Sequence, residues 1–117
     1  MWTLHKEIEF DAAHYLPQHS GKCKNLHGHR WRVIVEITAS RLNDQGMVMD
    51  FGDIKKVVHK YDHQCLNDFP PFDKQQPTAE LISSVICKDI AERIQSLGVS
   101  VSVTVFETPG ASVTYKL

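Results

Sequence analysis

Residues 23–39 read C-K-N-L-H-G-H-R-W-R-V-I-V-E-I-T-A, and in the second half of this stretch apolar residues occupy every other position. Successive side chains of a β-strand point to opposite faces of a sheet, so the alternation predicts a strand that is buried on one face. The preceding polar segment, which contains Pro17, Ser20 and Gly21, predicts a loop. The apolar face of the strand would carry Trp31, Val33, Val35, Ile37 and Ala39.

The residues before the loop repeat this pattern. Residues 2–14, W-T-L-H-K-E-I-E-F-D-A-A-H, alternate with Lys6 as the one interruption, and they predict another half-buried strand. Neighbouring elements in a chain usually lie side by side, so the two strands favour an antiparallel hairpin. The apolar face of this first strand would carry Trp2, Leu4, Ile8, Phe10 and Ala12.

Two helices are predicted in the middle of the chain. Asp50 can cap the first, which should end near Asp62 or His63, and Thr78 can cap the second, which Gly98 should stop. The prolines between them predict a loop. The apolar stripes are Ile54, Val57, Val58 and Tyr61 in the first helix, and Ile82, Val85, Ile86, Ile90, Ile94 and Leu97 in the second.

Alternation returns over residues 99–106 and again in S-V-T-Y-K near the end of the chain. The resulting order, β-β-α-α-β-β, predicts one α+β domain over residues 1–117, with a four-stranded antiparallel sheet and two helices on one face. Such a sheet leaves two strand edges open. We therefore expect the chain to form a homo-oligomer.

Composition excludes several classes of protein. The chain has 117 residues, 42% of them hydrophobic, and a net charge of -1, so it lacks the basic excess expected of a protein that binds nucleic acid or an anionic membrane. Its N-terminus lacks the features of a signal peptide, and no apolar run is long enough to span a bilayer. An odd number of cysteines without framework spacing fits a reducing compartment, so we expect a cytoplasmic protein.

Three histidines share the apolar faces of the predicted hairpin. His27 and His29 have the parity of Trp31, and His14 has the parity of Phe10. If the strands pair, the three imidazoles converge, as in a catalytic zinc site with an open fourth position. The alternative is that each ring is separately satisfied by hydrogen bonds. The remaining candidates, His5, His19 and His59, have polar neighbours and are expected at the surface.

Cys23 lies in the predicted loop between Lys22 and Lys24, whose positive charges favour a thiolate. It could be a fourth metal ligand that closes a structural site, or a nucleophile or general base beside the metal. The sequence leaves both readings open. Cys65 and Cys87 have no comparable setting, and Cys87 is expected to fill space within the long helix.

Two further groups are candidates for chemistry. Asp62 precedes His63, and a carboxylate next to an imidazole can orient it for acid–base work, although adjacent side chains often point apart. Glu107 ends a run of inward valines, where a charge needs a partner. That partner could be a Lys or Arg, or the strand could fray into solvent there. A buried carboxylate could also anchor a planar guanidine-like edge, such as that of a pterin.

Six short motifs, taken in their order and spacing, resemble the 6-pyruvoyl-tetrahydropterin synthase family, and most closely its bacterial branch that forms 6-carboxy-5,6,7,8-tetrahydropterin in queuosine biosynthesis. The resemblance covers nearly the whole chain. The motifs are F-D-A-A-H at 10–14, C-K-N-L-H-G-H at 23–29, M-D-F at 49–51, Y-D-H-Q-C-L-N-D at 61–68, P-T-A-E at 77–80 and F-E-T at 106–108.

The resemblance implies a tunnelling fold whose subunits join their sheets around a barrel, commonly as a hexamer of two trimers, with active sites at subunit interfaces. It implies Zn²⁺ held by the histidines at 14, 27 and 29, and Cys23 as the proton-abstracting base. It further implies Asp62 and His63 as a relay, Glu107 as the pterin anchor and a member of the relay, and Thr78 at the border of the pterin. Ala79 replaces a hydroxyl that the family often has at this position.

The implied substrate is 7,8-dihydroneopterin triphosphate. The queuosine-type enzyme is a carbon-carbon lyase that releases acetaldehyde and triphosphate, whereas the biopterin-type enzyme eliminates triphosphate and keeps a pyruvoyl group. A compact chain, and Cys23 without a glutamate directly before H-G-H, favour the queuosine type. A non-catalytic module that binds zinc or a pterin is the alternative from another class of protein.

Overall fold

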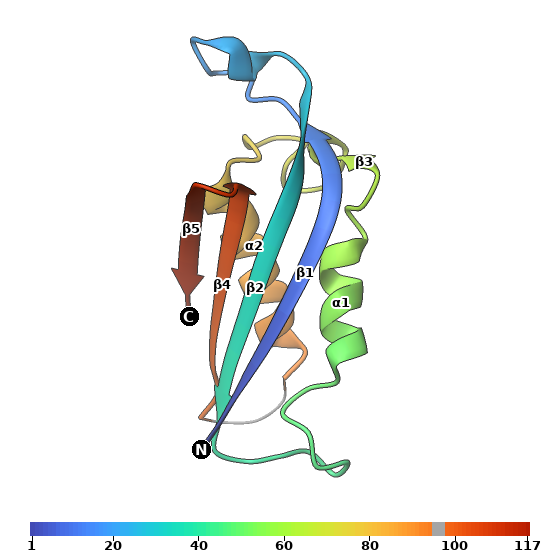
Figure 1. Ribbon diagram of the computed structural model, residues 1–117, viewed down its shortest axis with the longest axis vertical. Helices are drawn as coiled ribbons and strands as arrows, with labels where there is room; N and C mark the ends of the chain where they lie inside the picture. Colours follow the sequence, from blue (N-terminus) through green and yellow to red (C-terminus); the bar gives the residue numbers. More distant parts are fainter. Residues whose placement is uncertain (95–97) are drawn as a thin grey trace.

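The computed structural model describes residues 1–94 and 98–117 (Figure 1). Five strands form one sheet in the order β3-β1-β2-β4-β5, and all neighbouring pairs are antiparallel except β1 and β3. Two short 3₁₀ helices, η1 and η2, lie in the connections. The elements are β1 (Trp2–His14), η1 (Lys22–Lys24), β2 (His27–Ala39), α1 (Phe51–His59), β3 (Gln64–Cys65), η2 (Leu66–Asp68), α2 (Ala79–Glu92), β4 (Ser100–Thr108) and β5 (Ala111–Lys116).

The predicted hairpin is confirmed over its full length. β1 and β2 pair from Trp2 opposite Ala39 to His14 opposite His27. The connection between them, which carries η1, extends beyond the end of the sheet (Figure 1). The last residue of β1 and the first of β2 therefore lie together at the base of a projecting loop.

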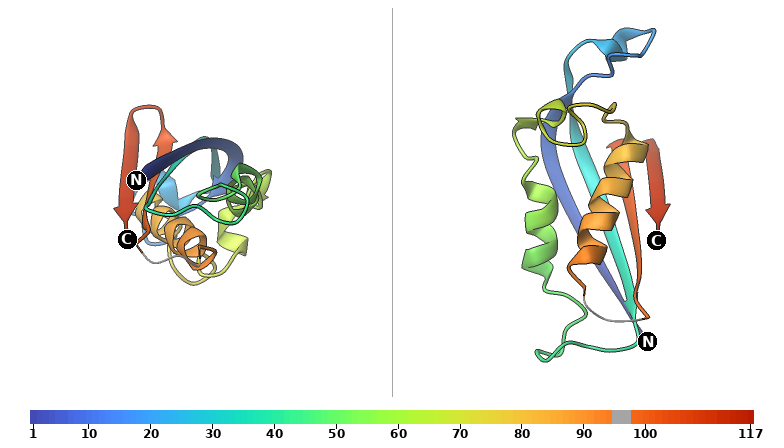
Figure 2. Two further views of the ribbon diagram at one scale, coloured as in Figure 1. Left: turned by 90° about the horizontal axis from the view of Figure 1, so that it is seen from below. Right: turned by 180° about the vertical axis from the view of Figure 1, so that it is seen from behind.

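The α+β class and the two helices on one face of the sheet are also confirmed (Figure 2). The predicted strand number was wrong, because Gln64–Cys65 adds a fifth, parallel strand beside Ala12 and Ala13. A strand of two residues is too short to show an alternating pattern, so periodicity could not reveal it. The described part of the chain contains no helix with the length and apolar character needed to cross a membrane.

Both helices begin where predicted and end earlier. Asp50 accepts a hydrogen bond from the Gly52 N–H, and the Thr78 hydroxyl accepts one from the Leu81 N–H. α1 stops at His59 because the chain turns toward β1, where the His63 N–H donates to the Asp11 carbonyl at 2.6 Å. α2 ends at Glu92 rather than at Gly98, and the predicted stripe position Leu97 lies outside the described residues.

The core lies between the sheet and the helices. The predicted face of β2 is completely buried from Trp31 to Ile37, and α1 and α2 cover it with Ile54, Ile82 and Ile86. Trp2 departs from the expected pattern, since 49% of its surface is exposed. β1 begins at Trp2, and the N-terminal end of β1 extends past the ends of both helices (Figure 1).

Candidate metal centre

Three imidazoles meet at the end of the hairpin that carries the projecting loop. His14 and His27 are register partners, and His29 lies opposite Ala12 on the same face. The ring centroids of His14 and His27 are 4.6 Å apart, and one ligand atom from each of the three residues lies within 4.8 Å of the others. The predicted convergence is confirmed, and these residues could hold a metal ion.

Two of the rings are fixed by backbone carbonyls. Nδ1 of His14 lies 2.9 Å from the Pro77 oxygen, and Nδ1 of His27 lies 2.7 Å from the Asn25 oxygen. A carbonyl oxygen can only accept, so each Nδ1 carries the proton and donates. The lone pair of each ring is therefore on Nε2, the arrangement in which histidine usually binds a metal with its other nitrogen held by an acceptor.

Burial favours the neutral form of His14 and His29. His14 is fully buried, and Nε2 of both His14 and His29 is buried without a hydrogen-bond partner among the described residues. Desolvation is the main cause that lowers the pKa of both imidazoles. Neutral rings with unsatisfied nitrogens disfavour the alternative of three separately satisfied histidines. They fit Zn²⁺, which accepts three imidazole nitrogens and leaves a fourth position open.

Glu107 lies directly beside this cluster. Its carboxylate oxygens are 3.7 Å from Nε2 of His14 and 3.8 Å from Nε2 of His29. β4 continues to Thr108, so the strand does not fray at Glu107. Among the described residues its carboxylate contacts these imidazoles, and it forms no ion pair with a Lys or Arg of the kind the alternative required. Glu107 also lines a cavity of about 250 Å³ together with Thr78.

Cys23 is half-buried in η1, within the projecting loop. Its sulfur is not part of the group of ligand atoms formed by the described histidines. The Leu16 N–H donates to the Cys23 carbonyl at 2.7 Å, and Leu16 lines the same cavity as Glu107 and Thr78. The backbone of Cys23 is thus tied to the rim of that cavity.

Asp62 and His63 form the predicted pair. The Nδ1 atom of His63 lies 2.8 Å from the Asp62 carboxylate, whose other oxygen accepts from the Asp11 N–H at 2.9 Å. The hydrogen bond from Asp11, followed by that from His63, lowers the pKa of Asp62. The side chain of His63 is 78% exposed, and it lines an open cavity of about 550 Å³ with His29.

Asn67 supports the centre and was missed in the sequence. It is 8% exposed, its amide donates to the Tyr15 carbonyl at 2.9 Å, and its oxygen accepts from the Tyr15 N–H at 3.0 Å. Tyr15 follows His14, so Asn67 fixes the chain where β1, which carries His14, enters the loop. Asn67 belongs to the motif at residues 61–68 that resembles the family. Hydrophobic periodicity could not identify its role, because that role is a pair of hydrogen bonds to the backbone.

The other histidines lie outside the cluster, as expected. The ring of His5 is exposed beside Glu36, His19 accepts from the Gly21 N–H, and His59 is hydrogen-bonded to the Glu9 carbonyl. Cys87 is buried within α2, which confirms its packing role.

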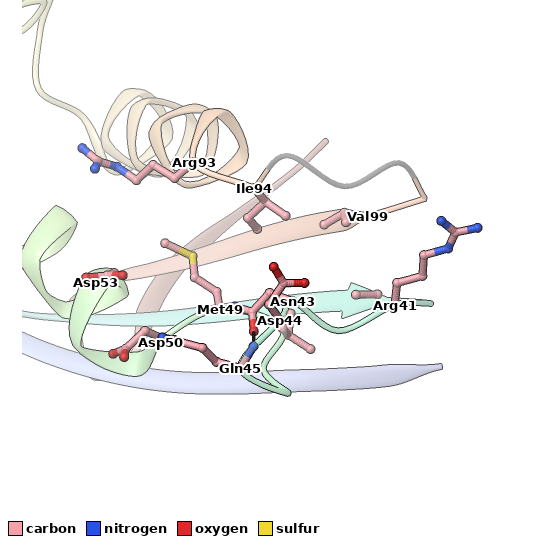
Figure 3. A pocket seen from close by; sticks show the side chains of 12 residues that line it. Arg41, Asn43, Asp44, Gln45, Met49, Asp50, Asp53, Arg93, Ile94 and Val99 are labelled. Carbon is pink, nitrogen blue, oxygen red and sulfur yellow. Dashed lines mark hydrogen bonds between the residues drawn. The ribbon is translucent and has the colours of Figure 1, made fainter.

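A separate cavity of about 500 Å³ lies at the opposite end of β2 (Figure 3). Charged side chains of both signs line it, among them Arg41, Asp44 and Asp53, together with the apolar Met49 and Val99. None of the predicted site residues lies there. The candidate chemistry is therefore concentrated at the loop end of the sheet.

Comparisons with known proteins show which family the chain resembles. Residues 3–117 match the family described as 6-pyruvoyl tetrahydropterin synthase. The chain is 41% identical over 101 residues to the 6-carboxy-5,6,7,8-tetrahydropterin synthase of Synechocystis sp., covering 79% of this chain and 77% of the relative. It is 33% identical over 124 residues to the enzyme of the same name from Bacillus subtilis, covering 98% and 85%.

A solved structure shows the same fold. The Caenorhabditis elegans 6-pyruvoyl tetrahydropterin synthase superimposes with a TM-score of 0.76 at 27% identity, covering 99% of this chain and 95% of that chain. Its tunnelling fold is the one expected from the sequence. The family match extends over nearly the whole chain and includes the three clustered histidines. The chain belongs to the 6-pyruvoyl tetrahydropterin synthase family.

Proposed function

We propose that this protein is a zinc-dependent carbon-carbon lyase that converts 7,8-dihydroneopterin triphosphate to 6-carboxy-5,6,7,8-tetrahydropterin, with release of acetaldehyde and triphosphate. The observation that carries the proposal is the cluster of three imidazoles, in which Nε2 of both His14 and His29 is buried without a partner among the described residues. The names of the Synechocystis and Bacillus relatives support the product. By the same relation we place the enzyme in queuosine biosynthesis and in the cytoplasm.

The histidines at 14, 27 and 29 would hold the Zn²⁺ ion. When bound, zinc supplies Lewis acidity toward the oxygens of the substrate side chain, which acidifies the neighbouring C–H bond. Cys23 is the group that we assign to removing the proton. Its absence from the cluster of described ligand atoms favours a base over a fourth ligand.

We assign proton relay to Asp62 and His63. The Asp62 carboxylate is fixed by the Asp11 N–H, so it can hold His63 in one orientation through the hydrogen bond at Nδ1. That bond leaves Nε2 of His63 for exchange with other groups. Because His63 is exposed in the single chain, its proton-transfer partner is expected to come from the substrate or a neighbouring subunit.

We assign recognition of the pterin to Glu107. A carboxylate can accept two parallel hydrogen bonds from the guanidine-like edge of a pterin, and Glu107 lies between the imidazole cluster and the cavity that Thr78 also lines. The Thr78 hydroxyl is engaged in capping α2. Its contribution to the site is therefore to set the position of the helix at the border of the cavity.

We further propose a homo-oligomer, with a hexamer of two trimers as the expected form. β3 pairs with β1 only at Ala12 and Ala13, and the segment from His59 to His63 bonds the outer backbone groups of Glu9 and Asp11. The outer edge of β1 is therefore open in its N-terminal half, and β5 forms the other edge of the sheet. Open edges favour pairing between chains. The metal-binding residues would then lie near subunit interfaces.

The test is anaerobic incubation of the zinc-loaded protein with 7,8-dihydroneopterin triphosphate, with mass spectrometry of the products and a hydrazine trap for acetaldehyde. A carboxy-tetrahydropterin with trapped acetaldehyde is expected. The pyruvoyl product would instead assign the chain to the biopterin-type reaction, and an absence of turnover would favour a binding module.

A pair of variants tests the role of Cys23. Cys23→Ala is expected to lower turnover by about 10²-fold to 10⁴-fold, the usual contribution of a general base, while zinc content is retained. The matched control is Cys65→Ala, which should keep both activity and zinc. If Cys23→Ala loses zinc together with activity, Cys23 is a ligand and not a base.

A further inference from the structure

The region around the projecting loop carries an uneven distribution of charge. Residues 12–35 contain no Asp or Glu, although the whole chain has a net charge of -1. The cations of this stretch are Lys22 and Lys24 in the loop, and Arg30 and Arg32 in β2. These four side chains differ in whether a carboxylate neutralises them.

The two arginines are neutralised by carboxylates of β1. Arg30 binds Glu9 at 2.8 Å and Asp11 at 3.2 Å. Arg32 lies 2.6 Å from Glu7 and stacks on the ring of a neighbouring phenylalanine. Because each guanidinium already faces a carboxylate, this part of the sheet offers little net attraction to an anion.

The two lysines are free of such partners. Lys22 and Lys24 are exposed, and neither forms an ion pair with any residue that the structure describes. They flank Cys23, whose carbonyl is held by the Leu16 N–H at the rim of the cavity shared with Glu107. The loop therefore presents two uncompensated ammonium groups on either side of the residue that is tied to that cavity.

We infer that Lys22 and Lys24 bind the polyphosphate group of the substrate. The inference rests on the proposed function, which requires a pterin whose side chain ends in a triphosphate. Lysine binds phosphate as a point charge with rotatable donors, and no described carboxylate forms an ion pair with either of these two ammonium groups. The pterin ring would lie toward Glu107 and the phosphates toward the loop, so one short segment carries both the proposed base and the phosphate contacts.

Binding of inorganic tripolyphosphate, measured by calorimetry on the zinc-loaded protein, tests the inference. Lys22→Gln and Lys24→Gln are each expected to weaken binding about tenfold, which is the usual value of a charge-assisted hydrogen bond, and the double variant more than either. The matched control is Lys56→Gln, which removes an exposed lysine from α1 and should leave affinity unchanged. Added salt should weaken binding less in the double variant.

The readouts separate this inference from the proposed function. Unchanged tripolyphosphate affinity in the double variant, or no binding to the unchanged protein, would overturn the inference even if the enzyme turns over its substrate. Weaker binding only in the loop variants would support it even if the reaction product differs from the one proposed. In the active enzyme, the double variant should raise KM for the triphosphate substrate and keep the affinity for unphosphorylated 7,8-dihydroneopterin.

Discussion

The orientation of the imidazole rings is set before any metal ion binds. The Pro77 and Asn25 carbonyls accept from Nδ1 of His14 and His27, so turning either ring would leave a carbonyl and an N–H unpaired. The free-energy cost of leaving these groups unpaired is larger for His14 than for His27, since His14 is fully buried. The two proposed ligands are therefore already held with Nε2 free, which would reduce the ordering that metal binding must impose.

Replacement of His14 tests its place in the centre. His14→Gln removes one of the three proposed ligands, and Zn²⁺ affinity is expected to fall by at least about 100-fold, as measured by competition with a chromogenic chelator. His19→Gln is the matched control, because His19 is an exposed loop residue outside the cluster. Equal zinc affinity in the two variants would show that His14 is not a ligand.

The metal-free protein should lose stability in mild acid. Burial lowers the pKa of His14 and His29 below the ordinary value of 6.5. In the unfolded chain both rings regain that value, so below it the unfolded state binds more protons than the folded state. The free energy of unfolding should be highest above pH 6.5 and should fall as the pH drops through this value toward the lower folded-state pKa values.

Urea unfolding of the metal-free protein across this pH range measures the effect. His29→Gln removes one of the two groups whose pKa is lowered in the folded state, so its free energy of unfolding should fall less steeply below pH 6.5. If the free energy of unfolding falls equally steeply with pH in the variant and in the unchanged protein, the pH dependence does not come from His29. His5→Gln, at an exposed position, is the control and should keep the full pH dependence.

At the level of residues, strand parity was sufficient to predict that three histidines would cluster. The positions of His14, His27 and His29 follow from alternation alone once the hairpin pairs. The carbonyls that orient the rings could not be predicted, because backbone groups leave no signature in a sequence. The pairing of Asp62 with His63 was equally open, since it depends on the positive φ of 59° at His63, which turns the chain there.

Among the elements, the β1–β2 connection is held by the segment that follows β3. Asn67 forms two hydrogen bonds with the backbone of Tyr15, at 2.9 and 3.0 Å, in the manner of a neighbouring strand. β3 itself contributes only Gln64 and Cys65 to the sheet. A side chain thus extends the pairing of β1 beyond the last backbone contact and supports the base of the loop.

Asn67→Ala tests this support. It leaves a donor and an acceptor of Tyr15 without their partner at a nearly buried position, so the free energy of unfolding should fall by about 1–3 kcal/mol in urea denaturation. Zinc affinity should fall as well, because Tyr15 adjoins His14. Gln75→Ala, at an exposed loop position, is the control and should change stability by less than about 0.5 kcal/mol. A loss no larger than the control's would contradict the role of Asn67.

The elements that could be predicted were the long ones. β1 was predicted with its observed bounds, Trp2–His14, because thirteen residues give a clear alternation. The end of α1 was not, since Tyr61 continues the apolar stripe and is buried in the core although it lies beyond the helix. Hydrophobic periodicity records which side chains are buried, and it does not record where the backbone leaves the helix.

For the whole molecule, the sheet and the histidine cluster differ in whether they need a second chain. The sheet has an open edge along the N-terminal half of β1 and another at β5, so pairing between chains would satisfy exposed backbone groups. The cluster needs no second chain, because all three clustered imidazoles come from one hairpin. Assembly should therefore depend on strand edges and be independent of the metal.

Removal of the metal tests this independence. After treatment with a chelator, the protein should lose zinc and activity while light scattering gives the same mass, a multiple of the 13.3 kDa chain. His14→Gln should likewise keep the mass of the unchanged protein. A metal ion bound within one hairpin cannot join two subunits. Dissociation to single chains on chelation would therefore contradict the prediction and show that the ion holds subunits together.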